Sequence, residues 1–298
     1  MIHGLNNTFL YSAKKLLVNF SNGTDKKSLQ GTGFFIKKDN EIILVTNRHV
    51  VEPEYGKCDL KGYIVSEFYI ESYQSFDSMG YPSKYNKSQI LNFNEFTFAK
   101  NDLNDVAILK DVRLHYPGME VNACIDYEML ADKEWFEKKL SVCDSIAYPG
   151  FPEWYDKKNN TPIFRMGTIA SDPRFDYAYN ARERFSQGAA RVAYEGFSSG
   201  GASGSPVFAV QKGFRVGNGI SAPDDFYRDV KLIGINAGHF VTRMEVDFTT
   251  ENNKNNDKRV RIDDKNIVEL DSNTSIVGHS GISYFYKSSV IKDMIDKL

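Results

Sequence analysis

Residues 200–208 read GGASGSPVF, a glycine-rich turn that leads directly into an apolar pair. Glycine lets the backbone turn tightly and come close to a bound molecule. A nucleophilic serine needs such an exposed turn, and the amides beside it can hold the charge that develops on an attacked carbonyl oxygen. The segment therefore favours a serine nucleophile, although an ordinary glycine–serine turn has the same composition.

A histidine and an aspartate each adjoin a short apolar run. His49 lies in LVTNRHVV at residues 44–51, just after an apolar run that itself follows GTGFFI at 31–36, so a hairpin would deliver it at its far end. Asp105 precedes the run VAIL at 106–109. Either residue alone is more often structural. A partly buried carboxylate needs a partner, however, and the imidazole of His49 is the obvious one.

The three segments occur in the order His49, Asp105, Ser203, which is one of several orders in which a catalytic triad is found. In this order and in their motifs they resemble the trypsin-like (chymotrypsin-fold) serine proteases. The likeness is strongest to the bacterial branch near the glutamyl endopeptidases and the high-temperature-requirement proteases. Four motifs carry it: GTGFFI at 31–36, VTNRHVV at 45–51, NDVAIL at 104–109 and GASGSPVF at 201–208. Weaker echoes are SIAYPGFP at 145–152, FRMGTIAS at 164–171, LIGINAG at 232–238 and GISYFY at 281–286.

The resemblance implies an all-β fold of two six-stranded antiparallel β-barrels, with the site between them. Residues 1–125 would form the barrel that carries His49 and Asp105, and residues 126–298 the barrel that carries Ser203. Short apolar runs bounded by turn residues independently predict strands. These runs are 33–36, 42–46, 106–109, 145–148, 206–210 and 231–235.

Two further expectations concern segments outside these runs. A C-terminal helix is indicated by an apolar face, with Ser289 as its cap. Residues 52–100 are polar and tyrosine-rich, so we expect them to form a surface excursion.

Carried over residue by residue, the resemblance also implies a mechanism. His49, Asp105 and Ser203 would be the catalytic triad, and the backbone amides of Gly201 and Ser203 would form the oxyanion hole. The family pattern selects Ser203 as the nucleophile, which leaves Ser205 as a small structural residue. The chain departs from the digestive members at Ala202, where they have an aspartate that pairs with a freed N-terminal ammonium. Control by N-terminal cleavage is therefore not expected.

The resemblance places a specificity pocket next to the nucleophile. Its base would be Phe197, six residues before Ser203, with Ser198 beside it, and one wall would be Asn236, Ala237 and Gly238. The opposite wall would begin at Gly281. Members that cut after Lys or Arg have an aspartate at the base, so we expect an uncharged, small-to-medium or apolar side chain here. An acidic side chain is the alternative, because His239 lies near the place where glutamyl-specific relatives have a histidine.

Composition narrows the classes of partner. A formal net charge of −2 marks neither an electrostatic nucleic-acid binder nor a membrane-surface binder. No run of about 18 apolar residues predicts a membrane span. The three cysteines have no framework spacing, so we expect buried free thiols and a cytoplasmic setting. No metal or cofactor is expected, since His239, His279 and Asp271 lack a characteristic ligand spacing.

The expected function is therefore a serine endopeptidase that acts on a protein or peptide substrate. Without an N-terminal latch, narrow specificity or a regulatory protein partner would have to limit its action. Two other functions stay open: a trypsin-like binding module that has lost catalysis, and an esterase that uses the same triad.

Overall fold

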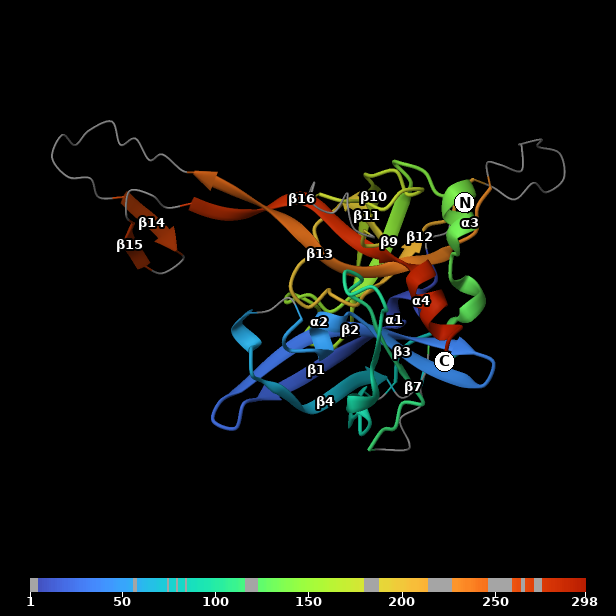
Figure 1. Ribbon diagram of the computed structural model, residues 1–298, viewed down its shortest axis with the longest axis horizontal. Helices are drawn as coiled ribbons and strands as arrows, with labels where there is room; N and C mark the ends of the chain where they lie inside the picture. Colours follow the sequence, from blue (N-terminus) through green and yellow to red (C-terminus); the bar gives the residue numbers. More distant parts are fainter. Residues whose placement is uncertain are drawn as a thin grey trace.

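Two antiparallel sheets make up most of the protein in the computed structural model, one above the other in Figure 1. The structure describes residues 5–55, 58–73, 75–78, 80–83, 85–115, 123–179, 188–213, 227–245, 259–263, 266–270 and 275–298. No helix in these ranges is long and apolar enough to cross a membrane.

The first sheet follows the order β5-β4-β1-β2-β3-β7-β6, with β8 paired in parallel to β2. Side chains on both faces of this sheet are buried, because Phe34 and Ile36 join one apolar cluster and Phe35, between them, joins another. The strands are β1 (Ala13–Ser21), β2 (Lys26–Lys38), β3 (Glu41–Thr46), β4 (Ile64–Tyr73), β5 (Tyr85–Gln89), β6 (Thr97–Phe98), β7 (Ala107–Lys110) and β8 (Ile125–Asp126).

This sheet is not the closed six-stranded barrel that the resemblance implies. Strand β7 ends at Lys110, and the next residue, Asp111, has a left-handed backbone with φ 51°. Beyond this break a single bridge joins Ile90 to Leu114, supported by the bond from the His115 amide to the Gln89 carbonyl, 2.9 Å. The two edges of the sheet thus meet through one bridge rather than through a continuous ladder.

The expectation of a surface excursion at residues 52–100 is also wrong in part. Strands β4 and β5 lie in this stretch, and β4 pairs with β1 along most of its length. Phe68 and Ile70 are fully buried from β4, two residues apart. This alternation, hidden among polar neighbours, is the sequence signal of a half-buried strand.

The second sheet closes into a six-stranded barrel in the order β10-β11-β16-β13-β12-β9, which confirms the expected second barrel. Strands β13 and β16 continue past it as a ribbon, paired as far as Glu245 and Ser275 (Figure 1). The strands are β9 (Ser145–Gly150), β10 (Ile163–Ile169), β11 (Arg191–Glu195), β12 (Pro206–Ala209), β13 (Lys231–Glu245) and β16 (Ser275–Lys287), and β14 (Arg259–Asp263) pairs with β15 (Asn266–Leu270).

Helices are short. The α-helices are α1 (Asn7–Tyr11), α2 (Arg48–Val51), α3 (Lys133–Lys139) and α4 (Ser288–Ile295), and the 3₁₀ turns are Cys58–Leu60, Phe93–Glu95 and Tyr127–Met129. The expected C-terminal helix is α4, but its N-cap position is Lys287 rather than Ser289. The hydroxyl of Ser288, the first helical residue, donates to the carbonyl of Ala131 instead (2.6 Å).

Cys124 and Cys143 are free thiols, but Cys143 is exposed, contrary to expectation.

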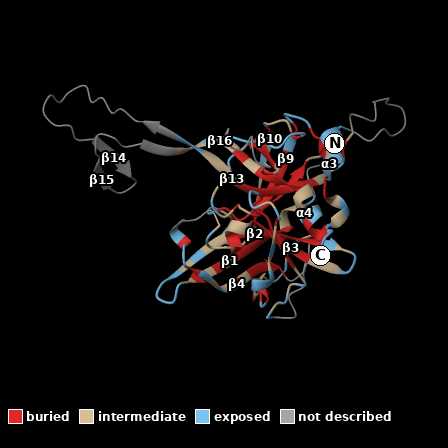
Figure 2. Ribbon diagram, viewed as in Figure 1, coloured by how far each residue is buried: buried red, intermediate tan, exposed pale blue. Residues whose placement is uncertain are grey.

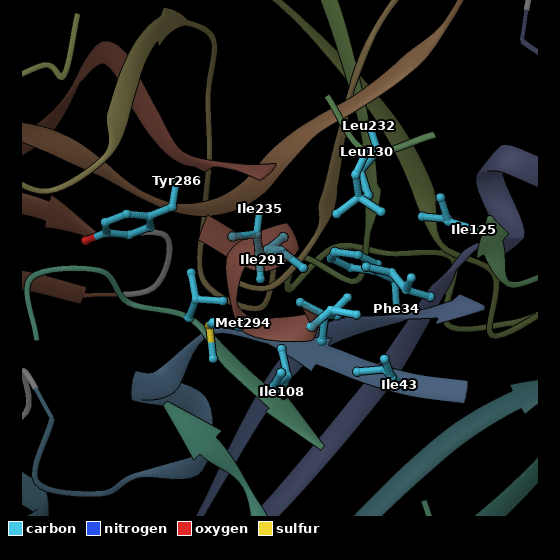
Figure 3. Packing of buried hydrophobic residues seen from close by; sticks show 14 of the residues in the cluster. Phe34, Ile43, Ile108, Ile125, Leu130, Leu232, Ile235, Tyr286, Ile291 and Met294 are labelled. Carbon is cyan, nitrogen blue, oxygen red and sulfur yellow. The ribbon is translucent and has the colours of Figure 1, made fainter. Parts of the chain in front are cut away.

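A shared apolar core holds the two sheets together. Phe34, Ile43 and Ile108 of the first sheet pack in one cluster with Leu232 and Ile235 of the barrel (Figure 3). Helix α4 adds its buried residues to the same cluster, so it seals the boundary between the sheets. Figure 2 shows buried residues running from one sheet into the other. The division at residues 125 and 126 stays a prediction.

Several charged groups are buried inside this framework, and one of them affects how stability depends on pH. Lys14, at the start of β1, is buried, and its Nζ donates to the Tyr11 carbonyl (2.7 Å). Burial disfavours the ammonium form and lowers the pKa of Lys14 from 10.5 to about 8. Below pH 8 the folded protein therefore carries a desolvated charge.

We expect this charge to make stability rise with pH. Between pH 8 and 10.5 the unfolded chain holds a proton on Lys14 that the folded protein has released, so deprotonation favours folding. The free energy of unfolding, relative to a Lys14→Met variant, should increase by about 3 kcal/mol across this window. Urea unfolding of both proteins at several pH values measures it, and parallel pH curves would contradict it.

Candidate active site

The first sheet brings His49 and Asp105 together. Strand β3 pairs antiparallel with β7, so the residues that follow β3 lie beside those that precede β7. His49 sits in the one-turn helix α2, and Asp105 comes two residues before β7. The imidazole Nδ1 lies 2.5 Å from Asp105 Oδ2, and the His49 amide donates to Asp105 Oδ1 (2.9 Å). The pairing predicted from the sequence is thus present.

The Asp105 carboxylate is buried and faces the imidazole of His49. Asp105 is 7% exposed, and the side-chain amide of Asn47 donates to its backbone carbonyl (2.6 Å). Within the described residues, His49 is the one basic side chain that pairs with this carboxylate. Burial, and next the negative charge of Asp105, raise the pKa of Tyr55 to about 12 and also raise the pKa of Tyr284. These neighbouring phenols therefore stay neutral.

The third residue, Ser203, lies in the tight turn before β12. Gly201 and Gly204 on either side of it have φ values of 84° and 90°, a region that favours glycine. A Cβ on Gly204 would come within 1.8 Å of the Thr32 carbonyl oxygen, and one on Gly201 within 2.3 Å of the Phe151 carbonyl oxygen. The turn can therefore press against Thr32 of the first sheet and against Phe151, which follows β9 of the barrel, only because these positions lack side chains.

Thr32 of β2 binds this turn across the boundary between the sheets. Its amide donates to the Ser203 carbonyl (2.8 Å), and its hydroxyl donates to the Gly201 carbonyl (2.7 Å). The same hydroxyl accepts the Phe151 amide (3.1 Å), and the Thr32 carbonyl accepts the Thr46 hydroxyl (2.8 Å). The sequence was used at GTGFFI, residues 31–36, only as a family motif, and these contacts of Thr32 were not predicted. A lone threonine between two glycines at 31 and 33 is the signal that could have indicated them.

The Ser203 hydroxyl donates to the carbonyl of Ala237 in β13 (3.2 Å). Across the described residues, no hydrogen bond joins this hydroxyl to His49. A change of rotamer would release it, and free enzymes often show such loose contacts before substrate binds. The other serine of the motif, Ser205, is 0% exposed, so no substrate can reach its hydroxyl.

The amides expected in the oxyanion hole are free to bind a ligand. In the described part of the chain, neither the Gly201 N–H nor the Ser203 N–H donates to a backbone or side-chain acceptor. Both belong to the turn that carries the Ser203 hydroxyl. The turn thus offers a nucleophile and two donors side by side.

The residues predicted for the pocket divide into two groups. Phe197 is 58% exposed, and its ring lies against the ring of His279, with centroids 4.8 Å apart. Phe197 and Gly281 also line a hollow of about 440 Å³ over β10, which the triad residues do not line. Gly238 lies on β13 with the Tyr284 hydroxyl close above it, and Ala237 is buried.

Asn236, predicted in the pocket wall, and Ser198, predicted beside the pocket base, instead lie beneath the nucleophile turn. Asn236 is 0% exposed and Ser198 is 3% exposed, and their side chains bind each other (2.8 Å). The expectation that the Asn236 side chain forms part of a pocket wall is therefore wrong, because this side chain points into the barrel.

Two histidines that the sequence did not assign lie next to Phe197 and Ser198. The rings of His239 and His279 stack with centroids 4.3 Å apart. Burial lowers the pKa of His239, and the neighbouring His279 lowers it further. Burial also lowers the pKa of His279; a backbone bond to Ser198 opposes this shift, and the charge of Arg165 adds a smaller lowering. The described residues contain no cluster of three His, Cys, Asp or Glu side chains that could hold a metal, and Asp271 lies outside them.

Comparison with known proteins assigns the chain to a family. Residues 31–217 match the family model described as trypsin-like peptidase domain, a range that includes His49, Asp105 and Ser203. The chain belongs to this family. Among solved structures, a thermostable serine protease AL20 from an extremophilic microorganism matches this trypsin-like chain with 14% sequence identity and a TM-score of 0.46, over 78% of this chain and 87% of that chain. No curated protein matches.

The Thr32 contacts lead to a prediction about alignment of the trypsin-like site. Thr32→Val keeps the shape of the side chain but removes both hydroxyl bonds, so only the backbone bond from the Thr32 amide to the Ser203 carbonyl still joins Thr32 to the turn. We expect turnover of a peptide substrate to fall about tenfold, with a stability loss of about 1–3 kcal/mol. Ser12→Ala removes one buried hydroxyl bond, to the Phe9 carbonyl, and is the matched control. Equal activity losses in both variants would contradict a specific role for Thr32.

Proposed function

We propose that the protein is a serine endopeptidase that hydrolyses peptide bonds through an acyl-enzyme. The observation that supports this most directly is the 2.5 Å pair of His49 and Asp105, beside a glycine turn that carries Ser203 and two free amides. Membership of the trypsin-like peptidase domain family supports the same activity.

We propose a role for each residue of this site. His49 takes the proton of the Ser203 hydroxyl as its oxygen attacks the substrate carbonyl, and then donates it to the leaving amine. Asp105 holds the imidazole tautomer through Nδ1 and stabilises the cation that forms. The Gly201 and Ser203 amides bind the oxyanion and contribute about 3–4 kcal/mol each. Water then releases the acyl group by the same steps, and no metal is required.

We also propose that the protein is a bacterial protease that acts inside the cell. Ala202 is fully buried and carries no carboxylate, so the family's N-terminal latch has no anchor here. Narrow specificity, or a partner that controls access to the site, would then keep such a protease from general proteolysis. A cytoplasmic location and a protein or peptide substrate complete the proposal.

The two serines of the motif provide the test of mechanism. Ser203→Ala should lower turnover by a factor on the order of 10⁶ without changing the melting temperature, because a half-exposed hydroxyl contributes little to packing. Ser205→Ala, the matched control, should keep most activity. Peptide hydrolysis and labelling by a fluorophosphonate probe measure both. A wild-type protein that the probe does not label would favour the inactive binding module, and cleavage of esters but not peptides would favour the esterase.

The surroundings of Phe197 favour the acidic alternative for specificity. His239, His279 and Arg165 gather around the stretch Phe197 to Ser199, and the Arg165 guanidinium reaches the Ser199 hydroxyl at 3.5 Å. In the described ranges no carboxylate pairs with Arg165 or with either histidine. A glutamate or aspartate side chain before the scissile bond would supply the missing negative charge. We therefore propose that the pocket prefers an acidic side chain to a neutral one.

Matched peptides that differ only by Glu or Gln before the scissile bond test this preference. We expect kcat/KM to favour Glu by about tenfold or more, because charge-assisted bonds are the stronger ones. The ratio should grow as pH falls from 8 to 5.5, since the lowered pKa values place imidazole protonation on the acid side. His279→Gln should reduce the ratio, and His115→Gln, in the first sheet, should not. An excess of Gln cleavage at every pH would restore the uncharged alternative.

A further inference from the structure

Asn236 of β13 is fully buried and uses every hydrogen-bonding group of its side chain. Its Nδ2 donates to the carbonyl of Ala202 (2.9 Å) and to the hydroxyl of Ser198 (2.8 Å). Its Oδ1 accepts the hydroxyl of Tyr194 from β11 (2.7 Å). The mechanism proposed above gives this residue no task, yet all its side-chain bonds lie directly under the nucleophile turn.

The bond from Asn236 to Ala202 helps to direct the Ser203 amide, together with the longer bond from the Ser205 amide to the same carbonyl (3.2 Å). A trans peptide is planar, with its C=O and N–H directed to opposite sides. The Ala202 carbonyl and the Ser203 N–H belong to one peptide, so a carbonyl held inward by Asn236 leaves the N–H facing outward. The Gly200–Gly201 peptide is held in the same manner, because its carbonyl accepts the Glu153 amide (3.2 Å). Both amides of the oxyanion hole are thus directed by bonds to the opposite ends of their peptides.

The orientation of the Asn236 amide is itself fixed. Burial raises the pKa of Tyr194 well above 10, so its hydroxyl keeps the proton that it donates to Oδ1. A flipped amide would place Oδ1 against the Ala202 carbonyl and NH₂ against this donor, leaving both contacts unpaired. The backbone of Asn236 adds two further bonds, from the Gly204 amide (2.8 Å) and to the Ser205 carbonyl (2.9 Å).

We propose that Asn236, oriented by Tyr194, is a positioning residue that presents the Ser203 amide to the oxyanion. This inference rests on the proposed function and adds a residue to it. Ala202 has no side chain that could hold the turn, so the neutral network behind the turn supplies the order that the oxyanion hole needs. Neither Asn236 nor Tyr194 touches substrate; they act through the Ala202–Ser203 peptide.

Asn236→Ala should reveal this role in the transition state rather than in binding. Loss of the Asn236 bond leaves the Ala202 carbonyl with only the longer bond from the Ser205 amide (3.2 Å), so the peptide can tilt and its N–H no longer meets the oxyanion squarely. We expect kcat to fall about 100-fold with KM unchanged, the size found for one such donor. A peptide boronic acid, whose adduct with Ser203 places an oxygen at the oxyanion position, should lose affinity by the same factor. The cleaved product peptide should bind as it does to the wild-type protein.

Tyr194→Phe provides a second variant in case Asn236→Ala does not fold. It keeps the ring and removes the donor to Oδ1, so we expect kcat to fall about tenfold. In the Asn236→Ala background the same change should have no further effect on kcat, because both act through one bond. Ser288→Ala removes a buried hydroxyl bond to the Ala131 carbonyl outside the turn and is the control for lost stability. It should lower the melting temperature but leave kcat intact.

The outcomes separate this inference from the proposed function. If the wild-type protein neither hydrolyses peptides nor reacts with a fluorophosphonate, the proposed function fails. If the wild-type protein is active and folded Asn236→Ala keeps its kcat and its boronic acid affinity, only the role of Asn236 is overturned. A rise in KM with unchanged kcat would likewise overturn it, since that result assigns Asn236 to ground-state binding.

Discussion

The candidate triad is divided between two sheets, so its geometry depends on the apolar core that these sheets share. His49 and Asp105 are fixed to one another by the pairing of β3 with β7, but Ser203 belongs to the barrel. Side chains from both sheets and from α4 fill the boundary between them. Close packing of this kind resists small displacements, because each shift opens a void or forces a clash. Apolar contacts therefore set the separation of the catalytic groups, and polar contacts need only refine it.

That refinement comes from two residues on opposite sides of one turn. Thr32 holds the Ser203 and Gly201 carbonyls from the first sheet, and Asn236 holds the Ala202 carbonyl from within the barrel. Three successive carbonyls are thus occupied by protein donors. The Gly201 and Ser203 amides remain free for a ligand. A loop rich in glycine is flexible in the unfolded chain, so this dense set of bonds offsets the entropy lost when it is ordered.

The sequence indicated the contact of His49 with Asp105 and the glycine turn of Ser203 more reliably than it indicated the first sheet. The motifs around His49, Asp105 and Ser203 could be recognised because reactive groups need particular neighbours, and the barrel strands because apolar runs ended at turn residues. The open first sheet could not be foreseen, since the break depends on the left-handed backbone of Asp111 and not on any apolar pattern. The role of Asn236 was missed for a related reason. A motif gives the position of a residue along a strand, but the side of the strand that faces the turn depends on register, here shifted by an irregularity between Asn236 and Gly238.

The neutrality of the network behind the turn limits how the site could be controlled. An ion pair that orders a loop depends on the protonation of its partners, whereas the bonds of Asn236, Tyr194 and Ser198 persist while the phenol keeps its proton. The order of the turn is then independent of pH across the neutral range. The Ser203 hydroxyl, in contrast, can change its partner at small cost. Exchanging its bond to the Ala237 carbonyl for a bond to His49 replaces one hydrogen bond by another, so the two states differ in free energy by about 1 kcal/mol. Substrate backbone that engages the β13 edge at Ala237 would compete for this carbonyl and release the hydroxyl. Binding and activation of the nucleophile would then be the same event.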